Sequence, residues 1–285
     1  MQTVELPSGT LEYETRGPED SSHPPVLFVH GAVVDHRLWT PVADVLAAAG
    51  YRSYAPTFPL GAHRIPWGPR HDRSARGAAT LITEFVAEFG LAQATLVGND
   101  TGGALCQLAL DTDPDLVARV VFTNCDAFDR FPPQPFPVLF SLLKRPALTR
   151  ALIAGPMQSR HIRHSPAGVG LLVTDPDPGL TRSMMEPLRT DPRIRDDLAA
   201  FLTSLDPDLL AATTPRLSRL TAPVSVVWGT ADRAFRPSLG RRLAAVFDQA
   251  TFTEVPGSRT FISLDRPQAL ADAIVEVGRR PAPTH

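Results

Sequence analysis

An acidic side chain stands at the centre of the segment Gly98-Asn99-Asp100-Thr101-Gly102, which has the form Gly-x-nucleophile-x-Gly. The segment directly follows an apolar run and directly precedes a helical stretch. A tight turn between a strand and a helix would hold the Asp100 side chain in a strained conformation, beside the free N–H groups of the helix N-terminus. There the carboxylate could act as a nucleophile or as a general base. The alternative is an ordinary turn in which Asp100 only caps the helix.

Short, continuous apolar runs indicate the sheet that must carry this turn. Such runs, bounded by turn residues, are typical of parallel strands buried on both faces, and they occur at Val26–Val29, Thr95–Val97, Val120–Phe122 and Val224–Trp228. Helices are expected between them, at 39–49, 78–89 and 103–110. The opening residues alternate around Ser8-Gly9 and predict an antiparallel hairpin at the sheet edge. Strands that alternate with helices predict an α/β fold with a mostly parallel sheet and helices on both faces.

The alternation of strands and helices stops between about Arg130 and Pro215. This stretch holds 13 of the 29 prolines and three of the four methionines, and no part of it reads as a strand. Short helices interrupted by proline are the best account. We therefore expect a core formed by residues 1–129 and 216–285, with a helical cap at 130–215 over the C-terminal edge of the sheet.

Composition limits the kinds of partner. The formal net charge is -2, which gives no overall reason to expect nucleic acid or an anionic membrane. No run approaches the ~20 apolar residues of a membrane span, and the N-terminus does not resemble a secretory signal. The only cysteines, Cys106 and Cys125, form neither a disulfide framework nor a zinc motif. We expect a cytoplasmic protein that acts on a small molecule without a metal or cofactor.

Over nearly its whole length the chain resembles the α/β-hydrolase superfamily. The resemblance rests on Phe28-Val29-His30-Gly31, on the Gly-Asn-Asp-Thr-Gly-Gly turn, on the helical insertion and on Trp228-Gly229-Thr230-Ala231-Asp232. It implies an α/β-hydrolase fold with a cap. With aspartate at the turn, the chain is most similar to haloalkane dehalogenases and epoxide hydrolases, which form an ester on that carboxylate and hydrolyse it with a histidine-activated water.

The same resemblance implies roles for further residues. The backbone N–H groups of Ala32 and Thr101 would form the oxyanion hole. Asp232 would be the acid that orients the catalytic histidine, and Asp126 is an alternative because some relatives place the acid there. The alternative for Asp232 is a solvated loop aspartate.

The catalytic histidine itself is missing. Thr260 stands where the family has it, 28 residues beyond Asp232 and directly before Phe261, and the only histidine after Asp232 is the terminal His285. A threonine hydroxyl cannot act as a base near neutral pH. The usual step that hydrolyses the ester therefore has no obvious base.

The groups that would assist the leaving atom in the two known reactions are missing as well. Dehalogenases bind the departing halide with side-chain N–H donors, but Thr101 follows Asp100 and Ala32 follows the His-Gly pair. Epoxide hydrolases protonate the epoxide with cap tyrosines, whereas the tyrosines of this chain all lie outside the cap, at Tyr13, Tyr51 and Tyr54. Dehalogenation is therefore disfavoured, and epoxide opening would need a different acid.

Other histidines could supply proton transfer. His63 lies in a loop that borders the pocket in this fold, and His161 and His164 lie in the cap at helical spacing, where they could contact substrate. For each of them the alternative is a structural or surface role. His30 is expected to hold the His-Gly loop.

Three hypotheses remain for the function. The first is a hydrolase, closer to an epoxide hydrolase or esterase, that uses Asp100 on a small to medium apolar substrate. The second is a biosynthetic lyase, isomerase or cyclase in which Asp100 moves a proton and the oxyanion hole stabilises an enolate. The third is a binding protein that keeps the fold and the pocket without catalysis.

Overall fold

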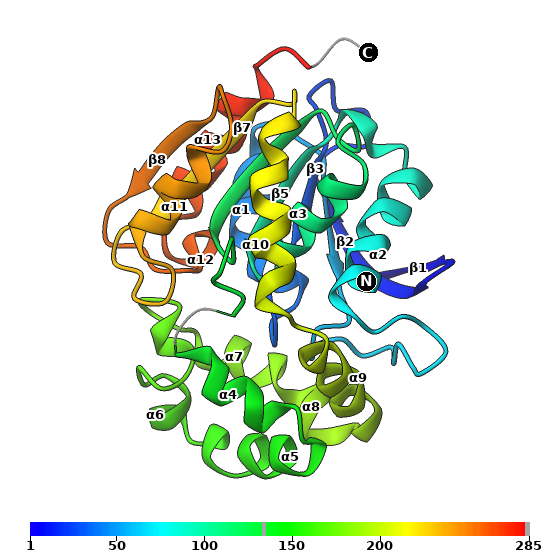
Figure 1. Cartoon of the computed structure of the whole chain (residues 1–285), viewed down its shortest axis with the longest axis vertical. Coiled ribbons are helices and arrows are strands. Elements are labelled where there is room, and N and C mark those ends of the chain that lie inside the picture. The colour runs from blue at the N-terminus through cyan, green and yellow to red at the C-terminus, as the bar shows by residue number, and fades with distance from the viewer. Residues whose placement is uncertain (133–134, 283–285) are drawn as a thin grey trace.

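An eight-stranded sheet forms the centre of the computed structural model, which describes residues 1–132 and 135–282 and leaves His285 outside the described part (Figure 1). The strand order is β1-β2-β4-β3-β5-β6-β7-β8; β2 pairs antiparallel with β1 and β4, and the other neighbours are parallel. The strands are β1 (Gln2–Leu6), β2 (Gly9–Arg16), β3 (Val26–Val29), β4 (Ser53–Thr57), β5 (Thr95–Asp100), β6 (Arg119–Cys125), β7 (Val224–Gly229) and β8 (Thr251–Val255).

Helices cover both faces of this sheet, as the sequence predicts. One face carries α2 (Ala75–Glu88), α3 (Thr101–Thr112), α10 (Pro207–Arg216) and α11 (Pro237–Ala244). The other face carries α1 (Thr40–Ala48), α12 (Ile262–Asp265) and α13 (Pro267–Gly278). Short 3-10 turns connect these elements at η1 (His36–Trp39), η2 (Leu91–Gln93), η3 (Pro156–Gln158), η4 (Val169–Leu171) and η5 (Leu217–Arg219).

The burial of each strand explains the pattern of its residues. Every residue of β3, β5, β6 and β7 is buried, because helices cover both faces of these central strands. The hairpin β1–β2 alternates buried and accessible residues, which confirms the predicted edge hairpin. Edge strand β8, mostly accessible to solvent, has no such apolar run. None of the described helices is long and apolar enough to cross a bilayer.

The insertion forms a helical layer over one edge of the sheet (Figure 1). Prolines begin several of its helices, a position that lacks an intrahelical partner for the N–H and so accepts proline. No strand falls among its described residues. The helices of this layer are α4 (Phe136–Leu143), α5 (Pro146–Ala154), α6 (Arg160–Arg163), α7 (Pro178–Met184), α8 (Glu186–Thr190) and α9 (Pro192–Thr203). By contrast α10, which the sequence assigns to the cap, packs against α3 of the core.

Glycines let the turn after β5 pack against its surroundings. A Cβ at Gly98 would lie 2.8 Å from the Cys106 sulfur, and one at Gly103 would lie 2.3 Å from the Cβ of Cys125. A Cβ at Gly102 would lie 2.3 Å from the backbone oxygen of Val29. Helix α3 therefore starts in direct backbone contact with the end of β3.

We expect Gly102→Ala to lower the free energy of unfolding by at least about 1–3 kcal/mol, because the added methyl group must displace backbone rather than a flexible side chain. Urea denaturation followed by circular dichroism measures the change. Gly179→Ala is the matched control, since a Cβ at this exposed helical glycine meets only the Asp177 carboxylate, at 3.3 Å. Equal stability of the two variants would contradict the packing argument.

Candidate active site

A cavity of about 470 Å³ separates the turn after β5 from the cap. Only Asp100, Thr101 and Asp126 bring polar side chains to its described wall. The rest of the wall is apolar or glycine, and comes from the core loops and the cap: Ala32, Val33, Val34, Pro132, Pro135, Phe136, Val138, Leu139, Phe140, Leu142, Leu143, Leu152, Ile153, Met157, Pro166, Ala167, Gly168, Val169, Leu171, Leu172, Met185 and Phe261. The few polar groups therefore converge at one place in an apolar cavity, an arrangement typical of a small-molecule site.

Asp100 is held at the junction of β5 and α3 in a strained conformation. Its φ is 53° and its ψ is -133°, and its exposed fraction is 8%. Burial is the largest influence on the carboxyl and raises its pKa to about 7. Hydrogen bonds from the backbone N–H groups of Thr101 and Ala32 act in the opposite direction, whereas the nearby charge of Asp232 raises the pKa further. The two donors that the sequence predicts for the oxyanion hole thus face the Asp100 carboxyl itself.

The His-Gly loop is shaped to bring the Ala32 N–H to this carboxyl. A Cβ at Gly31 would lie 2.1 Å from Asp100 Oδ2, so this position must be glycine. The buried His30 ring bridges the loop: Nδ1 lies 2.8 Å from the Gly31 oxygen, and Nε2 accepts from the Phe58 N–H at 2.8 Å. Burial lowers the pKa of His30 to about 4. The ring is neutral and structural, as expected.

Asp126 is a second buried carboxyl in the same cavity wall. Its backbone N–H donates to the Asp100 backbone oxygen at 3.4 Å, across the ends of β5 and β6. Burial and the neighbouring charge of Asp100 raise the pKa of Asp126 well above its usual range, and a hydrogen bond from the Thr101 side chain offsets part of this. Its Oδ1 has no hydrogen-bond partner among the described residues. Thr101 therefore contacts both carboxyl groups, through its N–H and its side chain.

Asp232 and Thr260 are joined by a hydrogen bond at the positions that correspond to the acid and the catalytic histidine of the family. Thr260 Oγ1 donates to Asp232 Oδ2 at 2.7 Å. Asp126, the alternative acid, makes no hydrogen bond to Thr260 within the described part of the chain. Burial raises the pKa of Asp232 to about 6, against hydrogen bonds from Phe235 N–H, the Thr260 hydroxyl, Ala234 N–H and the Asn124 amide.

Two asparagines support this arrangement, and the sequence analysis did not identify their roles. Asn124 Nδ2 donates to Asp232 Oδ2 at 2.7 Å, and its Oδ1 accepts from the Gly229 N–H at 2.7 Å. Asn99 Nδ2 donates to the Thr260 backbone oxygen at 2.8 Å. Both lie near the carboxyl end of a fully buried strand. A polar residue at the end of an apolar run in the sequence could have indicated their role.

The histidines proposed as substitutes for the missing base lie elsewhere. His63 is buried against the cap, where its Nε2 lies 3.4 Å from Asp197 Oδ2 and its Nδ1 accepts from the Gly61 N–H at 3.2 Å. His161 is exposed, and His164 Nε2 lies 3.0 Å from Thr181 Oγ1. None of the three is among the described residues that line the cavity. The expectation that these side chains reach substrate is corrected: each is held on the cap or beside it.

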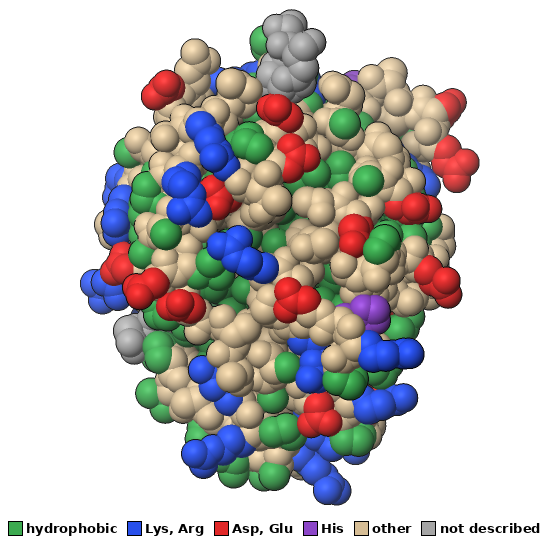
Figure 2. Space-filling view, turned by 45° about the vertical axis from the view of Figure 1, so that its right-hand side comes forward, with side chains coloured by type: hydrophobic (Ala, Val, Ile, Leu, Met, Phe, Trp, Pro, Cys, Tyr) green, Lys and Arg blue, Asp and Glu red, His purple; other side chains and the backbone are tan. Residues whose placement is uncertain are grey.

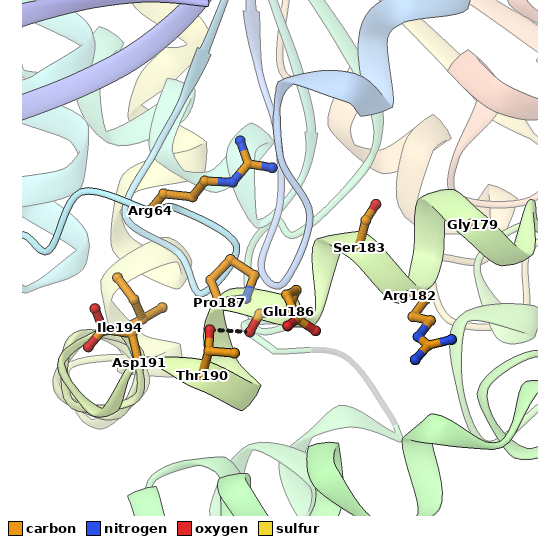
Figure 3. Close-up of a pocket in the computed structure, with 9 residues that line it drawn as sticks. All are labelled: Arg64, Gly179, Arg182, Ser183, Glu186, Pro187, Thr190, Asp191 and Ile194. Atoms are coloured by element: carbon orange, nitrogen blue, oxygen red, sulfur yellow. Dashed lines mark hydrogen bonds between the residues drawn. The ribbon is translucent and has the colours of Figure 1, made fainter.

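A second hollow, of about 540 Å³, lies beside α7, α8 and α9. Figure 3 shows Arg64 and Arg182 on opposite sides of it, with Glu186 between them. A hydrogen bond from Arg189 lowers the pKa of Glu186, and one from Arg193 lowers that of Asp191. These are ordinary paired surface charges. Among described residues this hollow shares no lining residue with the apolar cavity, which we take as the candidate active site.

Comparison with known proteins identifies the family of this chain. A model of the alpha/beta hydrolase family matches residues 26–273, and the chain therefore belongs to this family. Haloalkane dehalogenase 2 of Mycobacterium tuberculosis is 27% identical over 281 residues, which cover 90% of this chain and 89% of the relative. This agrees with the resemblance to the aspartate-nucleophile branch.

Solved structures show the same fold at lower identity. Haloalkane dehalogenase DbeA from Bradyrhizobium elkani has a TM-score of 0.76 and 18% identity over 97% of both chains. A thermophilic esterase from Thermogutta terrifontis has a TM-score of 0.70 and 19% identity, also over 97% of both. These likenesses confirm the α/β-hydrolase fold. Within the described residues, no cluster of three or more His, Cys, Asp or Glu side chains is arranged to hold a metal ion.

The raised pKa of Asp100 predicts how stability depends on pH. The pKa of the Asp100 carboxyl rises from its ordinary value of 3.8 to about 7 on folding. At a pH between these two values the folded protein therefore holds a proton that the unfolded chain has lost. The stabilisation from this carboxyl is complete below about pH 4 and is lost as the pH rises through 7. Asp100→Asn should therefore raise the free energy of unfolding by at least about 1 kcal/mol at about pH 8, and change it little at about pH 4.

Urea denaturation of the wild type and Asp100→Asn at the two pH values checks this prediction. Asp248→Asn, at an exposed position, is the control that removes one carboxylate without removing a buried one. A pH-independent difference between wild type and Asp100→Asn would show that the Asp100 carboxyl is ionised without cost in the folded protein.

Proposed function

We infer that the protein is a hydrolase that opens small to medium apolar epoxides, with Asp100 as nucleophile and Asp126 as the group that carries the proton. The observation behind this proposal is the pair of buried carboxyls at the polar end of an apolar cavity. Two like charges in one desolvated site cannot both ionise, so the pair holds one proton near neutral pH. Because the pKa of Asp126 is raised well above its usual range, that proton belongs on Asp126.

The first step is attack of the Asp100 carboxylate on an epoxide carbon. The carbon–oxygen bond of the ring breaks, and the ring oxygen takes the proton of Asp126. The products are an ester on Asp100 that carries a β-hydroxyl group, and an ionised Asp126. The proton donor that the sequence lacks among cap tyrosines is thereby supplied by a carboxylic acid. Positioned proton transfer of this kind is worth ~10²–10⁴-fold in rate.

The second step is hydrolysis of that ester. Asp126, now ionised, takes a proton from the attacking water, and the oxygen of the tetrahedral intermediate is stabilised by the N–H groups of Ala32 and Thr101. Collapse releases the alkoxide and leaves Asp100 as a carboxylic acid that carries the hydroxyl of the water. The alkoxide takes the Asp100 proton, so that the diol leaves, Asp100 is again ionised and Asp126 keeps the one proton of the pair. Neither step needs the missing histidine.

Halide release fits this cavity less well, although several relatives are named haloalkane dehalogenases. A departing halide needs N–H donors, and the polar side chains of the described wall are two carboxyls and a threonine.

A non-hydrolytic lyase or isomerase is the second candidate. The one-proton carboxyl pair beside two N–H donors could move a proton next to a carbonyl group, with no attacking water. A purely binding role is disfavoured, because the Asp100 carboxyl accepts from the N–H groups of Thr101 and Ala32 and shares the cavity wall with Asp126, so it is not sealed by apolar side chains alone.

Rapid quenching after exposure to small epoxides should trap an ester on Asp100 before Asp126 hydrolyses it. We expect intact-protein mass spectrometry to show one substrate mass on the wild type and none on Asp100→Asn. Asp126→Asn should form the adduct ~10²–10⁴-fold more slowly, because ring opening loses its acid. Asp129→Asn, a nearby exposed aspartate, is the control.

Turnover in ¹⁸O-labelled water resolves the outcome if no adduct accumulates. Attack by Asp100 places ¹⁸O in the peptide that contains Asp100 during the first turnover. Label that appears only in the diol, with an unlabelled peptide, would mean that Asp100 acts as a base and not as a nucleophile. Adduct formation at the wild-type rate in Asp126→Asn would remove Asp126 from the mechanism.

Thr260→His should add a second base to the site. The new imidazole would take the place of the hydroxyl at Asp232 and approach the Asp100 ester, so the hydrolysis of accumulated adduct should accelerate by up to ~10²–10⁴-fold. Because Thr260 is fully buried, overpacking should cost about 1–3 kcal/mol of stability. Rapid-quench measurement of adduct decay, with Thr260→Val as control, tests this. A folded variant with unchanged decay would count against a hydrolase-like geometry at Thr260.

A further inference from the structure

Basic charge is concentrated in one part of the cap. From Arg130 to Thr174 the sequence contains six Lys and Arg residues and no Asp or Glu. The other residues of the chain hold 22 Lys and Arg against 30 Asp and Glu. The net charge of -2 is therefore the sum of an acidic body and a strongly basic segment.

The cations of this segment are free to act on a partner. Lys144, Arg145, Arg150 and Arg160 are exposed, and none of them forms an ion pair within the described part of the chain. They lie in or beside α4, α5 and α6, and these three helices are neighbours through the contacts of α4 with α5, and of α5 and α6 with η3. In Figure 2 the lower end of the molecule, formed by the cap, shows Lys and Arg side chains among hydrophobic ones, together with an acidic side chain.

The same layer exposes large apolar side chains. Val138 is 70% exposed, Leu142 42%, Leu148 39% and Ile162 43%. With Met1 they are the large hydrophobic residues most exposed in the described structure, and all four belong to α4, α5 or α6. Val138, Leu142 and Arg145 follow one another at helical spacings of four and three residues, which places them on one side of α4 and its C-terminal end.

The apolar cavity reaches this surface. Val138 and Leu142 line the cavity although both are exposed. The opening of the candidate active site therefore lies on the face that carries the free cations and the apolar side chains.

We propose that the α4–α6 face of the cap docks on the surface of an anionic lipid bilayer. Exposed cations that form no ion pair attract anionic headgroups, and the exposed Val, Leu and Ile side chains enter the boundary between headgroups and acyl chains. A nucleic acid would use the charges but leave these apolar side chains in water. The acidic body faces away from the membrane, and the cavity opens toward the layer in which apolar substrates dissolve.

Co-sedimentation of the full-length protein with lipid vesicles tests this docking. We expect binding to vesicles of phosphatidylcholine mixed with phosphatidylglycerol, little binding to pure phosphatidylcholine, and weaker binding at high salt. The triple variant Lys144→Glu/Arg145→Glu/Arg150→Glu should lose binding by about 100-fold or more. Val138→Ser/Leu142→Ser, which keeps the charges, should bind more weakly and lose its binding at lower salt than the wild type.

The matched control is Arg76→Glu/Arg233→Glu/Arg236→Glu, which makes the same change in net charge at exposed positions of the core. Circular dichroism verifies that each variant is folded. No binding of the wild type to anionic vesicles, or equal loss of binding in the two triple variants, would overturn the proposal. So would a dimer seen by sedimentation that the cap variants disrupt, because a second copy would then cover this face. None of these outcomes depends on catalytic activity.

Discussion

The burial of the Asp100 carboxyl is the constraint on which the rest of the site depends. A carboxylate in an apolar cavity is far less stable than one in water, and hydrogen bonds to its charged form or a nearby opposite charge must offset that loss. The fold supplies two such donors, the N–H groups of Thr101 and Ala32, from the start of α3 and from the loop after β3. They are insufficient to keep the carboxyl fully ionised, since its pKa is still raised to about 7. The site therefore holds a carboxyl poised between its two protonation states.

Bringing backbone N–H groups this close to a side chain demands an unusual backbone. Asp100 and Val33 both adopt positive φ, of 53° and 62°, which costs a non-glycine residue of order 1–3 kcal/mol. Gly31 and Gly102 are needed because a methyl group at either would overlap the Asp100 carboxyl or the backbone of β3. The strain of Val33 and Asp100 lies in the loops at the carboxyl ends of β3 and β5, and the fully buried strands hold these loops in place. Phe128, after the carboxyl end of β6, also has a positive φ, of 55°.

Much of the fold, and the Asp100 turn, could be predicted because both depend on local pattern. Buried parallel strands need continuous apolar runs, and the turn needs glycines at fixed positions. Strand β8 lacks such a run because it is an accessible edge. The pairing of Asp126 with Asp100 depends on which strands are neighbours, and the contact of His63 with Asp197 joins residues far apart in sequence. Neither is visible from spacing. Thr260 could be matched to Asp232 only because the family resemblance fixed the distance between them.

The hydrogen bonds of Asp232 explain how the site tolerates threonine in place of histidine. Removing one partner from a buried carboxylate normally leaves a charge without compensation, which is strongly destabilising. Here the Thr260 hydroxyl and the Asn124 amide both donate to Oδ2 at 2.7 Å, and the N–H groups of Ala234 and Phe235 donate to Oδ1. Asp232 is thus satisfied without an imidazole, and its acceptor positions are occupied by groups that do not titrate near neutral pH. In the proposed mechanism, proton transfer in the cavity is therefore assigned to the two carboxyls that face it, Asp100 and Asp126.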